Sequence, residues 1–177
     1  ADILGSQGMS SVEGHGKVAP DEEQAKKFVS YTHSAIFTEV KIDAELGVPR
    51  VTRVVIAVAA GTIINPKTAR SQVLGGVVMG LGMALHEESM IDHRSGRIMN
   101  HNLAEYHVPA HADVQDIEVI FVEEEDDKAS PIGVKGLGEI GIVAVGAAVA
   151  NAIYHATGTR HRHFPITIDK IMEGLPN

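Results

Sequence analysis

A single carboxylate, Glu139, stands between glycines in the stretch PIGVKGLGEIG, residues 131–141. The apolar, alanine-rich stretch that follows it and ends at Gly158 predicts a helix that opens at GLGEIG, so the acid is expected where a loop turns into a helix. Acids are favoured there by the helix dipole and by unpaired N–H groups. The same surroundings keep a carboxylate ionised, as a general base requires. The residues alone therefore leave a structural and a catalytic role open.

Two further motifs only partly match known ligand sites. GLGEIG, residues 136–141, fits the dinucleotide pattern G-x-G-x-x-G, but no clear strand precedes it and the next acid after Glu139 is Asp169. HEESM begins like the zinc pattern H-E-x-x-H, but Met90 stands where the second ligand must be. We therefore expect neither an NAD site nor a zinc site, and no metal ligand among the scattered histidines.

Composition limits the classes of protein to which the chain can belong. Its 177 residues suffice for one ordinary domain, and 44% apolar residues predict a folded, soluble protein. A formal charge of −8 argues against a nucleic-acid surface, and the absence of cysteine excludes disulfides and Cys-ligated clusters within this chain. The apolar run 73–85 is shorter than the roughly 20 residues of a membrane span. No secretory signal is visible at the start, and the compartment, cytoplasmic or periplasmic, stays open.

The chain divides into an N-terminal arm and a domain. Residues 1–30 are expected to form an extended arm or the end of a preceding segment, and residues 31–177 the domain. Alternating β-branched residues predict a hairpin of residues 35–43 against 51–60. Because VVIAVAA in the second strand is continuously apolar, this strand is expected at the centre of a sheet.

A long helix is predicted from Asn65, as N-cap, and Pro66 to about Glu88. Four internal glycines, at positions 75, 76, 80 and 82, each disfavour a helix by about 0.5–1 kcal/mol relative to Ala. Something must therefore approach this helix closely. Another backbone is the simpler candidate, and a bound ligand is the alternative.

The remaining elements complete an α+β fold. The stretch HRSGR predicts a hairpin turn, DIEVIF a strand, and the acidic run 123–127 a solvated loop. The alanine-rich helix should end at Gly158, and a short helix should lie at the C-terminus. We thus predict a mixed sheet with a long, buried, glycine-containing helix and a second, alanine-rich helix.

Several separated segments together resemble the C-terminal part of the molybdenum-binding subunit of the xanthine dehydrogenase and aldehyde oxidoreductase family, most closely its bacterial aldehyde oxidoreductases. The resemblance covers roughly residues 31–171, and family subunits are several times longer. It rests on HSAIFTEVKIDAELGVPRVTRVV, GTIINPKTARSQVLGGVVMGLGMALHEE, NHNLAEYHVPAHAD, and PIGVKGLGEIG with AVANAIYHATGTRHRHFPIT.

The resemblance implies roles for named residues. The glutamate of the family's GxGE motif, here Glu139, is the base that takes a proton from the hydroxyl group on molybdenum. Ala59 and Ala60 stand where many relatives carry an aspartate, which removes a polar contact there. The implied cofactor-binding residues are Thr62, Ile63, Ile64, Asn65, Pro66, Lys67, Thr68, Gln72, Lys135, Gly136, Leu137 and Gly138. The free N–H groups at the start of the helix that follows Asn65 are expected to bind the phosphates of the dinucleotide.

The resemblance also implies the function and its accessories. The chain would be the C-terminal lobe of a molybdenum hydroxylase that oxidises aldehydes to carboxylic acids, or hydroxylates N-heterocycles, with water as oxygen source. Its cofactor would be molybdopterin, as the cytosine dinucleotide, and its partners would be the N-terminal remainder of the subunit and subunits that carry iron–sulfur clusters and FAD. The chain alone would be inactive. The alternative is a non-catalytic cofactor-binding or assembly domain of the same fold.

Overall fold

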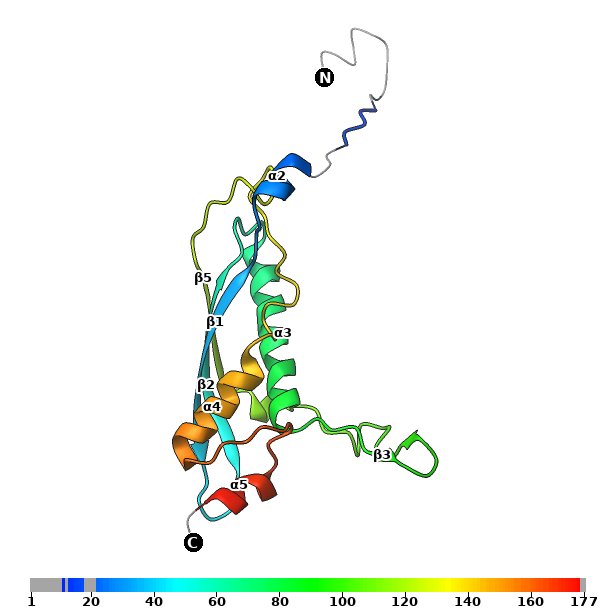
Figure 1. Ribbon diagram of the computed structural model, residues 1–177, viewed down its shortest axis with the longest axis vertical. Coiled ribbons are helices and arrows are strands. Elements are labelled where there is room, and N and C mark those ends of the chain that lie inside the picture. The colour runs from blue at the N-terminus through cyan, green and yellow to red at the C-terminus, as the bar shows by residue number, and fades with distance from the viewer. Residues whose placement is uncertain (1–10, 12, 18–21, 176–177) are drawn as a thin grey trace.

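The computed structural model describes residues 11, 13–17 and 22–175, and we restrict the description to them. A three-stranded sheet forms one layer of an elongated body, and the two main helices, α3 and α4, lie along one of its faces (Figure 1). A small hairpin projects sideways from the body near the C-terminal end of α3 (Figure 1). The fold is therefore of the α+β class, as the sequence predicts.

The sheet contains strands β1 (His33–Ile42), β2 (Pro49–Ala59) and β5 (Asp116–Phe121) in the order β1-β2-β5. β1 and β2 are antiparallel, whereas β2 and β5 are parallel and are joined through α3. The hairpin turn contains Gly47 at φ 66°, a conformation that favours glycine. The predicted hairpin and the central position of its second strand are confirmed.

Helix α3 (Pro66–Leu85) begins where the sequence predicts and ends three residues earlier than predicted. The Asn65 side chain caps its N-terminus, and at the other end the N–H groups of His86 and Glu87 both donate to the Gly82 carbonyl. This shared acceptor ends the helix before Glu88. The helix is buried on one face only, because Met79 and Met83 are exposed.

Helix α4 (Val145–Thr157) begins later than the sequence predicts. Residues 138–144 form turns, so Glu139 lies six positions before the first helical residue instead of at the helix entrance. The expectation that a helix N-terminus surrounds Glu139 is wrong. The predicted end of this helix is confirmed, because Gly158 adopts the left-handed conformation with φ 75°.

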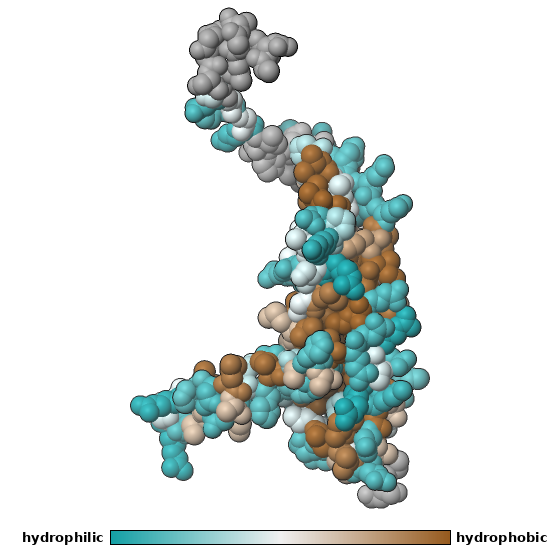
Figure 2. Space-filling view, turned by 180° about the vertical axis from the view of Figure 1, so that it is seen from behind, coloured by the Kyte–Doolittle hydropathy of each residue, from teal (hydrophilic) through white to brown (hydrophobic). Residues whose placement is uncertain are grey.

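The hydrophobic core lies between the sheet and the two helices. Its members come from alternate positions of β2 and from the facing sides of α3 and α4, as expected when a sheet and amphipathic helices share one core. The opposite face of the sheet exposes Phe37 and Ile120, and apolar surface runs along the body (Figure 2). The main core residues are Val54, Ile56, Val58, Val73, Val77, Leu81, Val145, Val149 and Ile153.

Short elements complete the structure. They are α2 (Glu22–Lys27), β3 (Ile91–Asp92), β4 (Arg97–Ile98), the 3-10 helix η1 (His111–Asp113) and α5 (Ile168–Gly174). The hairpin around HRSGR and the terminal helix are thus confirmed. The predicted arm lies partly outside the described residues, and its described part includes α2. None of the helices in the described ranges is long and apolar enough to cross a membrane.

Candidate functional site

The two segments predicted to bind a cofactor lie side by side although about 70 positions separate them along the chain. Gly61 and Val134 form an antiparallel bridge, and the Thr62 N–H donates to the Gly133 carbonyl at 2.8 Å. On the other side of the bridge, the Lys135 N–H donates to the Ala60 carbonyl at 3.2 Å. These bonds pair the residues that follow β2 with the residues that precede the glycine-rich loop, and they bring the predicted site residues together.

Helix α3 holds the same loop through a side chain and through close packing. The Gln72 amide Nε2 donates to the Gly138 carbonyl at 2.6 Å. One turn further on, a Cβ added at Gly76 would lie 2.8 Å from the carbonyl carbon of Gly141. The predicted close approach to α3 is therefore a backbone contact at Gly76, whereas Gly75 has open space around it.

Glu139 is exposed on this loop. Its carbonyl accepts a bond from the Ile142 N–H at 3.2 Å, which closes the turn that follows it. Within the described part of the chain, no acceptor is bonded to the backbone N–H groups of residues 136–139. The loop therefore presents a carboxylate beside a run of backbone donors that are free to bind water or another molecule.

The first turn of α3 differs from the expectation of free N–H groups. Asn65 Oδ1 accepts from the N–H groups of Lys67 and Thr68 at 3.1 and 3.2 Å, and its carbonyl accepts from the Ala69 N–H. Pro66 has no N–H, so this turn has no free backbone donor, and that expectation is wrong. The exposed Lys67 side chain remains to interact with an anion at this end.

Lys135 does not project freely into the site. Its ammonium contacts Glu124 Oε1 at 2.5 Å and Asp126 Oδ2 at 2.9 Å, and its side chain is only 7% exposed. The two carboxylates raise the pKa of Lys135, and its ammonium lowers the pKa values of both, that of Asp126 to about 2. The prediction of a wholly solvated acidic loop is wrong at Glu124 and Asp126, because a buried ammonium needs anionic partners.

Glu124 and Asp126 were not among the residues predicted to belong to the site. Their spacing was the available signal: in an extended segment, residues two positions apart point to the same side, so Glu124 and Asp126 can reach one cation together. Glu123, Glu125 and Asp127 are exposed, as predicted. Half-buried and exposed positions thus alternate within the acidic run.

The other predicted residues divide between surface and core. Thr62, Ile64, Gly136 and Gly138 are exposed, and open space surrounds the position of a Cβ at either glycine. The side chains of Ile63 and Leu137 pack against the hydrophobic core instead. These two side chains attach the two segments to the core. Any contact of Ile63 or Leu137 with a ligand would therefore come from the backbone.

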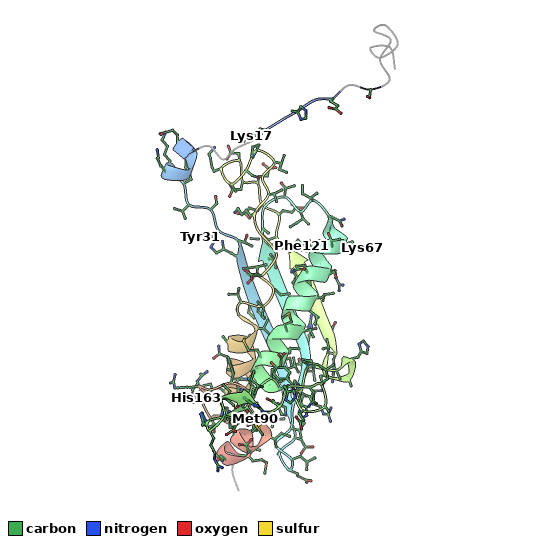
Figure 3. All side chains as sticks on the ribbon, turned by 90° about the vertical axis from the view of Figure 1, so that its right-hand side faces the viewer. Lys17, Tyr31, Lys67, Met90, Phe121 and His163 are labelled. Atoms are coloured by element: carbon green, nitrogen blue, oxygen red, sulfur yellow. The ribbon has the colours of Figure 1, made fainter. Side chains whose placement is uncertain are left out.

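The opposite end of the body holds a separate cavity. Figure 3 shows Lys67 at one end of α3 and Met90 and His163 toward the other, and α3 itself is about 30 Å long from its 20 residues. A cavity of about 420 Å³ lies at the far end, lined by Leu81, Leu85 and neighbours. In the described ranges, no group of three or more His, Asp or Glu side chains could hold a metal ion.

Comparison with known proteins identifies the family. Residues 4–115 match the family model of the molybdopterin cofactor-binding domain, which includes residues 62–72 but not Glu139. The chain is 48% identical over 153 residues to the aldehyde oxidoreductase molybdenum-binding subunit PaoC of Escherichia coli, a match that covers 86% of this chain and 21% of PaoC. The chain therefore spans about a fifth of the length of that relative.

Solved structures share the fold. The aldehyde oxidoreductase of Desulfovibrio desulfuricans superposes with a TM-score of 0.73 at 30% identity, over 82% of this chain and 16% of that one. Quinoline 2-oxidoreductase of Pseudomonas putida gives a TM-score of 0.71 at 31% identity, over 77% and 17%. The family model, the relatives and the shared fold agree, and the chain belongs to the molybdopterin cofactor-binding domain family of aldehyde oxidoreductases and xanthine dehydrogenases.

Proposed function

We propose that residues 62–72 and 135–139 form part of the surface that binds the molybdopterin cofactor, with Glu139 as the catalytic base. One observation carries this proposal: Gln72 ties the exposed loop that bears Glu139 to the first turns of α3. The loop that this bond restrains carries both the carboxylate and the free backbone N–H groups of residues 136–139. Family membership supplies the ligand class.

The residues present fit such a group. A pterin dinucleotide offers hydrogen-bond acceptors and phosphate charge, and the N–H groups of residues 136–139 are unpaired donors within the described structure. Open space at Gly136 and Gly138 lets a bulky molecule reach this backbone. Consecutive backbone N–H groups of a loop are a known way to bind anions without a basic motif.

In the proposed reaction, the bound cofactor supplies the two-electron oxidation of the substrate. Glu139 accepts a proton at its carboxylate from the hydroxyl group that attacks the substrate carbon, which makes this oxygen a stronger nucleophile. The Gln72 bond to Gly138 restrains the loop, so the carboxylate is held near the reacting group. The packing of Gly141 against α3 limits the loop from its other side.

The proposed substrates are aldehydes, oxidised to carboxylic acids, or N-heterocycles, which are hydroxylated. We propose that the cofactor is the cytosine dinucleotide form. We also propose partner subunits that carry FAD and iron–sulfur clusters. The clusters are assigned to partners because this chain has no cysteine to ligate one. Since the chain spans 21% of PaoC, it would supply only part of the site and be inactive alone.

Replacement of Glu139 by Gln in the complete protein, with its partner subunits, tests the assignment. The amide keeps the size of the side chain but cannot act as the base. We expect turnover to fall by about 100-fold or more, the scale of general-base catalysis, while molybdenum and pterin content stay unchanged. Glu125→Gln, in the exposed part of the acidic run, is the matched control. Unchanged turnover in Glu139→Gln would favour the non-catalytic alternative.

A further inference from the structure

The Lys135 ion pair connects three chain segments that meet beside the proposed cofactor surface. Lys135 precedes the glycine-rich loop, Glu124 and Asp126 belong to the acidic run after β5, and Gly61 follows β2. The side chain of Lys135 is 7% exposed, and those of Glu124 and Asp126 are 30% and 16% exposed. The contact is thus largely shielded from water. An ion pair that is shielded in this way is stronger than one on an open surface.

Glu124 links both halves of the proposed cofactor surface directly. Its Oε1 atom contacts the Lys135 ammonium at 2.5 Å, and its Oε2 atom accepts from the Gly61 N–H at 3.0 Å. Gly61 has φ 65°, and a Cβ there would collide with the Gly133 carbonyl oxygen. One carboxylate therefore bridges the start of residues 62–72 and the start of residues 135–139 at the point where their backbones are in contact.

Asp126 contacts the same ammonium from the position just before the turn at residues 127–129. Its Oδ1 atom accepts from the N–H groups of Lys128 and Ala129, each at 2.9 Å, and Oδ2 contacts Lys135 at 2.9 Å. The Ser30 hydroxyl also donates to Oδ2 at 3.5 Å, so contacts on both oxygens restrain the carboxylate. Lys135 is thereby restrained by two anions of the acidic run.

We propose that Glu124 and Asp126 are positioning residues, which hold residues 62–72 and 135–139 at the separation that the cofactor needs by fixing Lys135 between them. The proposal rests on the proposed function, because it assigns a task to groups beside that surface. It also specifies the role of Lys135, which the resemblance implies only as a cofactor-binding residue: its ammonium orients the two segments.

Two matched sets of variants in the complete protein test this inference. Glu124→Gln and Asp126→Asn each remove one charge from the contact, whereas Glu125→Gln removes an exposed charge from the same run. Lys135→Met removes the cation, and Lys135→Arg keeps it. Four quantities are measured: molybdenum content, backbone hydrogen exchange at Thr62 and Lys135, kcat, and KM.

We expect Glu124→Gln and Asp126→Asn to lower molybdenum content or kcat by about 10-fold, the lower end of what loss of orienting groups costs at cofactor sites. Exchange at Thr62 and Lys135 should accelerate while the amides of β2 and α4 stay protected, and Lys135→Arg should recover part of what Lys135→Met loses. If Glu124→Gln or Asp126→Asn does not fold, the comparison of Lys135→Met with Lys135→Arg tests the inference instead.

The inference would be overturned if Glu124→Gln and Asp126→Asn had the same molybdenum content, kcat and hydrogen exchange as Glu125→Gln. Equal losses in Lys135→Arg and Lys135→Met would also count against it. This outcome is separable from failure of the catalytic assignment. If Glu139→Gln retains full turnover, molybdenum content and hydrogen exchange of the charge variants still report on the positioning role.

Discussion

Gln72 and Gly138 are joined by a hydrogen bond of 2.6 Å between a side-chain amide on α3 and the carbonyl immediately before Glu139. The two residues are 66 positions apart in the chain. This bond restrains the loop together with the packing of Gly141 on α3, the packing of Leu137 on the core, and a bond from the Thr32 hydroxyl to the Gly136 carbonyl at 2.6 Å. The position of the proposed base thus depends on a residue of the helix that follows β2.

Replacement of Gln72 by Leu should reduce turnover with little effect on the core. A single hydrogen bond contributes about 0.5–1.5 kcal/mol, so its loss corresponds to a roughly 2- to 10-fold fall in kcat if the loop must be ordered for reaction. Ser71→Ala, at the exposed neighbouring position, is the control. Steady-state kinetics of the complete protein measures the difference, and equal kcat values for the two variants would refute a role for the bond.

Two adjacent glycines of α3 should respond oppositely to alanine. A Cβ at Gly76 would lie 2.8 Å from the backbone of Gly141, so Gly76→Ala should destabilise the protein by about 1–3 kcal/mol, as overpacking does. Gly75 has no atom within 4 Å of that position, and Gly75→Ala should stabilise by about 0.5–1 kcal/mol through helix propensity. Urea unfolding measures both, and the same sign for both variants would contradict the close packing.

The Asn65 cap should contribute to the stability of α3. Asn65→Ala leaves the N–H groups of Lys67 and Thr68 without their acceptor and should cost about 0.5–2 kcal/mol. Asn65→Asp retains an acceptor oxygen and should unfold close to the temperature of the wild type. Thermal unfolding followed by circular dichroism checks the order; a cost in the aspartate variant as large as in the alanine variant would argue against capping.

The acidic contact predicts a loss of stability at low pH. The folded-state pKa of Asp126 is about 2, below its ordinary value of 3.8. The ionised carboxylate therefore stabilises the folded protein at pH values above 3.8. This contribution is lost as the pH falls from about 5 toward 2, when the carboxylate takes up a proton. Glu124, whose pKa is also lowered, acts in the same direction.

Urea unfolding at a series of pH values tests this expectation. Asp126→Asn lacks the titrating carboxylate, so its stability should change less than that of the wild type between about pH 5 and pH 2. Glu125→Gln should follow the wild type. Parallel curves for the wild type and Asp126→Asn would show that Asp126 contributes nothing to the pH dependence.

Local patterns in the sequence determined the β1–β2 hairpin, the start of α3 and the glycine that ends α4. Each depends on residues close together in the chain: alternating β-branched side chains, an Asn-Pro cap, and Gly158 in a left-handed conformation. The family, too, was recognisable from separated motifs. The late start of α4 could not be predicted from the sequence. The turns at residues 138–144 are stabilised by packing of Gly141 on α3, and no local pattern indicates such a contact.

Only the tertiary structure decided how the candidate site is assembled. Glu124 and Asp126 belong to a run whose charge predicts solvent, yet they meet Lys135 because β5 returns parallel to β2 and brings the acidic run next to Gly61. Likewise, Gln72 reaches Gly138 only because the loop crosses α3. Such contacts join residues far apart in the chain, so their energies depend on the fold as a whole and are absent from any local window of the sequence.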